Sequence, residues 1–114
     1  MAETQNMTFF LVHYSHPDRK GWSQHLEPHL DWLLDRVGDG SLVASGPTVG
    51  TAVPSALLLF KAANHDAVKT IIDTDPFMVE GQVSDLWITE WDPIFGVFHD
   101  ESSQASVPME KIGR

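Results

Sequence analysis

The order of six apolar segments constrains the fold of this chain more than any other feature. Four are short runs typical of β-strands, and each is flanked by residues that favour turns. They cover residues 8–14, 41–45, 55–62 and 83–91. Two longer segments, residues 22–37 and 64–75, have apolar residues at the spacing of an α-helix. The sequence therefore predicts the order strand, helix, strand, strand, helix, strand.

The first helical segment is amphipathic, and a proline complicates its start. Its apolar residues recur every three or four positions; they are Leu26, Leu30, Leu33, Leu34 and Val37. Pro28 lacks a backbone donor and is tolerated best in the first turn of a helix. We expect the regular helix to begin there, with residues 21–27 as an irregular or kinked lead-in. Gly38-Asp39-Gly40 is predicted to end it.

The second helical segment has clearer ends. Asn64 is a good N-cap, and the apolar stripe that follows is Ala67, Val68, Ile71 and Ile72. Asp75-Pro76 is predicted to end the helix, because the residue before proline is pushed out of the helical region. The whole order is the split βαβ arrangement called ferredoxin-like. We expect an α+β fold with a four-stranded antiparallel sheet and both helices on one face.

Size and composition set broad limits on the class of protein. A chain of 114 residues that is 42% hydrophobic forms one domain with a core. No apolar run approaches the roughly 18 residues of a membrane span, and the polar residues 1–6 do not resemble a signal peptide, so we expect a cytoplasmic protein. The absence of cysteine excludes disulfides, thiolate nucleophiles and thiolate zinc sites.

The charge argues against nucleic acid as a partner. Seven basic and 16 acidic residues give a formal net charge of −9. Such a chain repels a phosphate backbone, and its lysines and arginines are too scattered to form a basic groove. The charge itself indicates solubility and no particular chemistry.

Topology brings polar residues from three distant stretches to one edge of the sheet. With right-handed crossovers, the start of the first helix, the end of the second and the hairpin after residue 45 all lie at that edge. His29, Asp75 and Ser45-Gly46-Pro47 should therefore converge. His29 lies at the flank of the apolar helix face, so we expect a half-buried imidazole in the first turn, where the helix dipole favours the neutral base.

His29 and Asp75 together provide the minimum set of groups for proton transfer. Asp75 would orient the imidazole of His29 and stabilise its charged form once a proton arrives. The alternative is a helix-end histidine bonded to a loop aspartate for structural reasons alone, since such pairs are common.

Other histidines and aromatic residues were weighed as candidates. His13 and Tyr14, at the same end of the first strand, are interpreted as pocket-wall residues, and Trp22 and Trp32 as core or interface residues. His25 and His29 have the i, i+4 spacing of a metal pair, but Pro28 between them undermines that geometry and no acidic ligand is spaced to join them. We predict no metal site.

The last strand indicates a partner surface. Apolar bulk lies on both of its faces, since Leu86 and Ile88 alternate with Trp87 and Trp91. A sheet covered by helices on one side needs only one apolar face. We expect a homodimer that buries the open sheet face.

An ordered set of short motifs resembles the YciI-like (YCII-related) family. The set is His29-Leu30, Gly40, Leu42-Val43, Ser45-Gly46-Pro47, Asp75-Pro76-Phe77, Gly81 and Trp91. The resemblance covers about residues 8–95, which suggests one domain over residues 1–96 and a C-terminal extension over residues 97–114. Two features depart from the family pattern: Pro28 directly precedes the histidine, and the extension is added.

The resemblance implies a fold, a site and a chemistry. Family members are ferredoxin-like domains that pair as dimeric α+β barrels and share a His and Asp pair proposed as the active site. Matching positions make His29 and Asp75 the catalytic candidates, with Ser45 and Gly46 as pocket-lining candidates. One branch is a dehydrochlorinase of a chlorinated hydroxyhydroquinone, and muconolactone isomerase belongs to the wider barrel superfamily.

Two functional hypotheses follow. The first is a lyase or isomerase, without a cofactor, in which His29 and Asp75 perform general acid-base proton transfer on a small cyclic or aromatic substrate. The second is a non-catalytic dimeric module that binds a small molecule or serves as an accessory protein, with His29 and Asp75 only binding or bracing.

Overall fold

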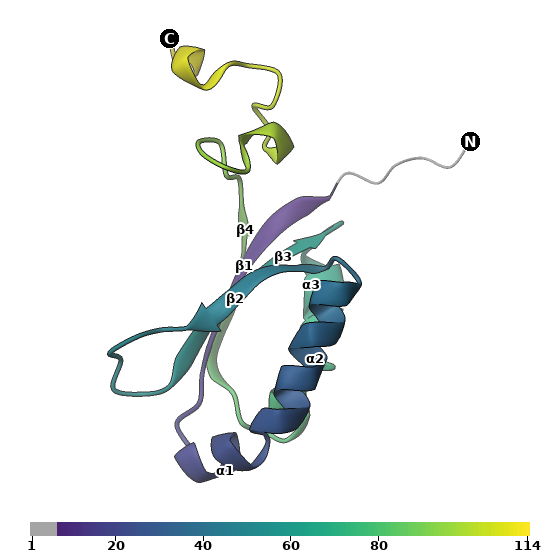
Figure 1. Cartoon of the computed structure of the whole chain (residues 1–114), viewed down its shortest axis with the longest axis vertical. Coiled ribbons are helices and arrows are strands. Elements are labelled where there is room, and N and C mark those ends of the chain that lie inside the picture. The colour runs from purple at the N-terminus through teal and green to yellow at the C-terminus, as the bar shows by residue number, and fades with distance from the viewer. Residues whose placement is uncertain (1–6) are drawn as a thin grey trace, which may run out of the picture.

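The computed structural model of the chain describes residues 7–114 (Figure 1). Residues 1–6, whose polar character argues against a signal peptide, lie outside the described residues. The strands are β1 Thr8–Ser15, β2 Leu42–Pro47, β3 Ser55–Ala62 and β4 Ser84–Trp91. The helices are α1 Arg19–Gln24, α2 Leu26–Gly38, α3 His65–Ile72 and α4 Pro76–Val79, followed by the 3-10 helices η1 His99–Glu101 and η2 Met109–Lys111.

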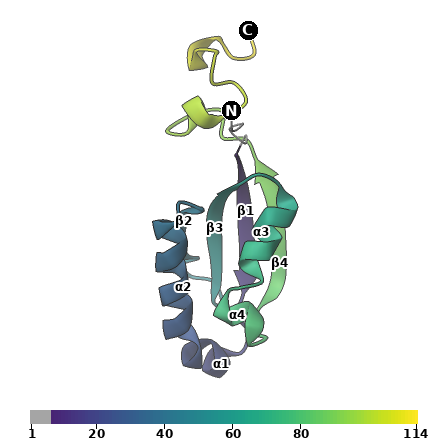
Figure 2. The same ribbon diagram turned by 90° about the vertical axis from the view of Figure 1, so that its right-hand side faces the viewer.

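The four strands form one antiparallel sheet in the order β2-β3-β1-β4. Helices α2 and α3 lie side by side against the same face of this sheet (Figures 1 and 2). The predicted α+β ferredoxin-like fold is therefore confirmed. No helix of the described residues is long and apolar enough to cross a membrane.

The start of the first helical segment differs from the prediction. Two helices, α1 and α2, replace one helix with a kinked lead-in, and His25 between them leaves the helical conformation at φ −106° and ψ 10°. Pro28 is the third residue of α2, where a backbone N–H would have no partner within the helix. Proline therefore fits the first turn of α2 without breaking it.

Two further boundaries differ from those expected. β2 continues to Pro47, since Gly46 pairs with Leu57 and Pro47 with Ala56. α3 ends at Ile72, before the predicted stop at Asp75-Pro76, and Asp75-Pro76 instead starts the short helix α4: the Asp75 side chain accepts a hydrogen bond from the Phe77 N–H, and Pro76 occupies the first helical position. Here proline with an aspartate before it is thus the start signal of the next helix.

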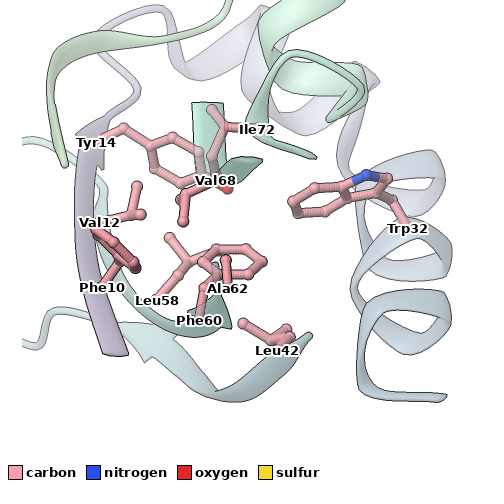
Figure 3. Packing of buried hydrophobic residues seen from close by; sticks show 10 residues of the cluster. All are labelled: Phe10, Val12, Tyr14, Trp32, Leu42, Leu58, Phe60, Ala62, Val68 and Ile72. Atoms are coloured by element: carbon pink, nitrogen blue, oxygen red, sulfur yellow. The ribbon is translucent and has the colours of Figure 1, made fainter. Parts of the chain in front are cut away.

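The core lies between the sheet and the helices (Figure 3). Its buried residues are Phe10, Val12, Tyr14, Trp32, Leu42, Leu58, Phe60, Ala62, Val68 and Ile72. Trp32 reaches it from α2, and its indole N–H donates to Thr74 Oγ1 at 2.9 Å. This contact joins α2 to the segment after α3.

The face of α2 that points into the core is not the predicted leucine stripe. His29 and Trp32 are the buried residues of α2, whereas Leu30, Leu34 and Val37 are 45, 69 and 56% exposed. Leu26, Leu30 and Leu33 instead line a cavity between α2 and the strands. Leu33 also packs against the core, whereas Leu34 and Val37 belong neither to the core nor to the cavity wall.

The other face of the sheet is open over much of its area. Leu57, Trp87 and Trp91 are 42, 44 and 40% exposed on it. The C-terminal tail lies beyond one end of the sheet (Figures 1 and 2), where the Phe98 ring packs 5.0 Å from that of Phe9 and Lys61 pairs with Glu101.

Candidate active site

The site is built around the fully buried carboxylate of Asp75. Its Oδ1 lies 2.8 Å from His29 Nδ1 and accepts a hydrogen bond from the Phe77 N–H at 2.9 Å. Its Oδ2 accepts one from the Tyr14 hydroxyl at 2.6 Å. The donors come from α2, α4 and β1, so one side chain ties three elements together. Three donors offset the large cost of burying a carboxylate.

The contact with Asp75 fixes the tautomer of His29. An ionised carboxylate only accepts hydrogen bonds, so Nδ1 of the imidazole carries the hydrogen. In the neutral ring, Nε2 is then the nitrogen with a free lone pair. The ring is buried, 6% exposed, and not half-buried as expected, because Phe77 stacks on it at 4.1 Å between centroids.

The Tyr14 hydroxyl is a permanent donor to Asp75. Burial, followed by the negative charge and the hydrogen bond of Asp75, raises the pKa of the Tyr14 phenol far above its ordinary value. The phenol therefore stays protonated over the whole pH range in which proteins normally work. It keeps Asp75 Oδ2 occupied and leaves Oδ1 to His29.

A cavity of about 350 Å³ borders His29. This volume suits a small molecule. Besides Leu26, Leu30 and Leu33 of α2, its apolar wall residues are Trp22, Pro47, Pro54, Ala56, Leu58 and Phe77. Polar side chains on the wall are His16, His29, Ser45, Thr48 and Ser55. Asp75 lies behind His29 and is not part of the wall, so only the imidazole can meet a ligand directly.

The structure brings together five of the six predicted site residues, and His13 alone of the six lies elsewhere. His29 and Asp75 are bonded, and Ser45 and Gly46 of β2 line the same cavity. Tyr14 is not a wall residue; it supports Asp75 from behind. His13 lies on the opposite sheet face, where its ring stacks on that of Trp87 at 5.4 Å and Nδ1 lies 3.0 Å from the Asp85 carbonyl oxygen.

The tryptophans and the other histidines complete the comparison with the sequence. Trp32 is a core residue, as interpreted, whereas Trp22 lines the cavity. His25 Nε2 lies 4.0 Å from Glu80 and is not part of the wall. Within residues 7–114, no group of three potential His, Cys, Asp or Glu ligands could hold a metal ion.

His16 is the wall residue that the sequence analysis missed. Its imidazole is buried, and its Nδ1 lies 2.7 Å from the Gln82 carbonyl oxygen. A signal was present: His16 follows β1 at the same sheet edge where His29 and Asp75 were expected. The sequence alone does not single it out, because His16 directly precedes Pro17 and a turn there already explains the residue.

Fold and site together define a class: a small ferredoxin-like α+β domain with a buried His and Asp pair beside a cavity. The family model of the YCII-related domain matches residues 7–92. The chain belongs to the YCII-related family. Residues 1–6 and 93–114 lie outside the match.

A solved structure supports the fold assignment. The chain is similar to 5-chloro-2-hydroxyhydroquinone dehydrochlorinase (TftG) from Burkholderia phenoliruptrix, solved in complex with 2,5-dihydroxybenzoquinone. The two sequences are 20% identical, and the alignment covers 73% of this chain and 92% of that chain with a TM-score of 0.63. A conserved protein of unknown function from Bacteroides thetaiotaomicron is 10% identical over 77% of this chain and 100% of that chain, with a TM-score of 0.49. No curated protein matches the sequence.

Proposed function

We propose that this protein is a lyase or isomerase that needs no cofactor and transfers a proton through His29 on a small cyclic or aromatic substrate. One observation carries the proposal: an imidazole on the wall of a cavity is bonded through Nδ1 to a buried carboxylate. A base held in this way by a third group is the usual arrangement for general acid-base catalysis.

The proposed steps follow from the geometry. Nε2 of His29 accepts a proton from a hydroxyl group or a ring carbon of the substrate, and Nδ1–H keeps its bond to Asp75. The resulting imidazolium is paired with the carboxylate at 2.8 Å, which stabilises the charge. In an isomerase the imidazolium returns the proton to another substrate atom. In a lyase the imidazolium returns the hydroxyl proton to the ring carbon that bears chlorine, which gives a keto tautomer with a C–H bond at that carbon. The C–Cl bond then breaks and chloride leaves with the bonding pair, while a second hydroxyl proton passes through His29 to water. The net loss is HCl and the ring becomes a quinone.

The similar structure supplies a first compound to assay. TftG is named as a dehydrochlorinase of 5-chloro-2-hydroxyhydroquinone and holds a dihydroxybenzoquinone. Both are small rings that suit the size of a cavity of about 350 Å³. We therefore choose 5-chloro-2-hydroxyhydroquinone as the candidate substrate.

The experiment is chloride release by the wild type, by His29→Gln and by His25→Gln as the matched control. His25 precedes the same helix but lies outside the cavity wall. Loss of the base should lower the rate by roughly 10²–10⁴-fold in His29→Gln, whereas His25→Gln should stay near the wild type. Equal rates in all three proteins would remove His29 from the reaction.

The alternative function is a dimeric module that binds a small molecule without turning it over. It is favoured by the structural work of Asp75, whose hydrogen bonds cap α4 and join it to β1 and α2. In that case the wild type binds the chlorinated ring but releases no chloride. The same assay, run beside a binding measurement, separates the two functions.

We further propose that two copies pair through the open sheet face. In support, Leu57, Trp87 and Trp91 leave large apolar surfaces exposed there, and Trp87 lies against His13. Contiguous exposed apolar side chains on one face mark an interaction site more often than isolated ones do. A second copy presents the same apolar face and would cover it.

A further inference from the structure

His16 is a second histidine on the wall of the His29 cavity. Its side chain is buried, with 3% of the residue exposed, and it stands at the end of β1. Its ring centroid lies 4.5 Å from that of Phe77 and 4.9 Å from that of Tyr14, and Trp22 stacks on it at 6.4 Å and 19°. These aromatic neighbours fix the orientation of the imidazole.

The hydrogen bond to Gln82 determines which nitrogen is free. A backbone carbonyl oxygen only accepts, so Nδ1 of His16 donates to it at 2.7 Å. The lone pair of the neutral ring is then on Nε2. Among hydrogen bonds of the described residues, none involves Nε2 of His16, although this residue lines the cavity.

The two histidines differ in the acceptor that Nδ1 of each ring contacts. His29 is backed by a carboxylate, which stabilises a bound proton. Nδ1 of His16 instead donates to a neutral carbonyl oxygen. Burial lowers the pKa of His16, and the charge of His29 lowers it further by a smaller amount. The hydrogen bond to Gln82 and the charge of Asp75 act in the opposite direction. His16 is therefore a weak base but a good hydrogen-bond acceptor near pH 7.

Phe77 places both imidazoles around one aromatic ring. Its centroid lies 4.1 Å from the ring of His29 and 4.5 Å from that of His16. The cavity thus presents two acceptors beside each other. No Lys, Arg, Asp or Glu is found among the described residues that line it, so the wall offers no fixed charge to neutralise an ionic ligand.

We propose that His16 accepts a hydrogen bond from a substrate hydroxyl and thereby selects uncharged rings with two hydroxyl groups, one for each histidine. His16 is thus a substrate-contacting residue that sets specificity, while His29 moves the proton. This inference rests on the proposed function only in taking the His29 cavity as the substrate site.

The test is a binding series of hydroquinone, its monomethyl ether and its dimethyl ether, followed by NMR titration of the wild type and of His16→Phe. The wild type should bind hydroquinone about three- to tenfold more tightly than the monomethyl ether, beyond the statistical advantage of two equivalent hydroxyls. His16→Phe should lose this preference and keep its affinity for the monomethyl ether.

Two further variants keep the test sharp. His16→Asn retains a side-chain acceptor and should restore part of the preference, which also covers a poorly folded His16→Phe. His25→Phe, outside the cavity wall, should behave as the wild type. Long-range nitrogen–proton NMR should show His16 Nε2 without a hydrogen at neutral pH.

The outcomes are distinct from those for the proposed function. If His16→Phe keeps the full preference, or if the wild type binds none of the three compounds, the role of His16 is wrong even when His29→Gln abolishes chloride release. If His29→Gln turns over normally while His16→Phe loses the preference, the proton-transfer function fails and the specificity role stands.

Discussion

The Asp75 carboxylate joins residues 14, 29 and 77, which are far apart in the sequence. Its partnership with His29 could be predicted, because both residues stand at the ends of elements that the topology places at one edge. The supporting position of Tyr14 could not. Alternation along β1 gives the face on which Tyr14 lies, but whether that face meets a cavity or a carboxylate depends on how α2 and α4 pack.

Tyr14→Phe should destabilise the fold. The change leaves Asp75 Oδ2 buried without a donor, and we expect the free energy of unfolding to fall by about 1–3 kcal/mol. Urea unfolding followed by circular dichroism measures it. Thr51→Val, which removes a hydroxyl with exposed hydrogen bonds, is the control and should change stability by less than about 0.5 kcal/mol. A tyrosine variant as stable as the wild type would show that the bond contributes little.

His16 should make stability depend on pH in mildly acidic solution. Its pKa is lowered in the folded state, so the unfolded chain takes up a proton first as the pH falls through about 6.5. The free energy of unfolding should therefore decrease from about pH 7.5 to about pH 5.5, by at most about 1.4 kcal/mol per pH unit for one proton. His16→Asn should flatten this dependence in urea titrations. An equal slope in both proteins would contradict the burial argument.

Local sequence signals predict the type and order of the secondary-structure elements better than they predict which face of each helix is buried. Gly40, at φ +84°, lies in the turn that ends α2, and Asn64 caps α3, as the sequence indicates. The predicted orientation of α2 was wrong, because periodicity alone cannot distinguish leucines that pack into the core from leucines that border a cavity. A cavity lined by leucine produces the same pattern as a packed interface.

Asn64→Ala should weaken α3 without affecting the cavity. The Asn64 side chain accepts a hydrogen bond from the Ala67 N–H at 2.8 Å, and loss of such a cap costs about 1 kcal/mol. Asn64→Asp keeps the acceptor and should stay near the wild type. Thermal unfolding of the three proteins measures the effect, and an alanine variant with unchanged stability would mean that the cap is not formed in solution.

At the scale of the whole molecule, α2 and α3 cover one side of the sheet (Figures 1 and 2). The cavity lies on this side, between α2 and the strands, and Trp87 and Trp91 are exposed on the other side. Apolar residues on both faces of residues 83–91 indicated this from the sequence. The packing of the tail at one end of the sheet could not be predicted, since residues 97–114 carry no clear periodicity. Phe98 and Glu101 now account for its position.

Leu57→Glu should disrupt the proposed dimer. Leu57 is 42% exposed on the open face, and a charge buried there without a partner is costly. Sedimentation velocity should give a dimer for the wild type and a monomer for the variant. Leu34→Glu on α2, where Leu34 is 69% exposed, is the matched control and should remain dimeric. A wild type that is monomeric at all concentrations would refute the pairing.

The central claim is that His29, oriented by Asp75, moves a proton within the cavity, and hydrogen–deuterium exchange on a ring tests it most directly. Hydroxyhydroquinone would be incubated anaerobically in D₂O with the wild type or with His29→Gln, and its ring protons followed by NMR. The account predicts exchange above the buffer rate with the wild type and at the buffer rate with His29→Gln. Equal exchange with both proteins, or none above buffer with either, would contradict it.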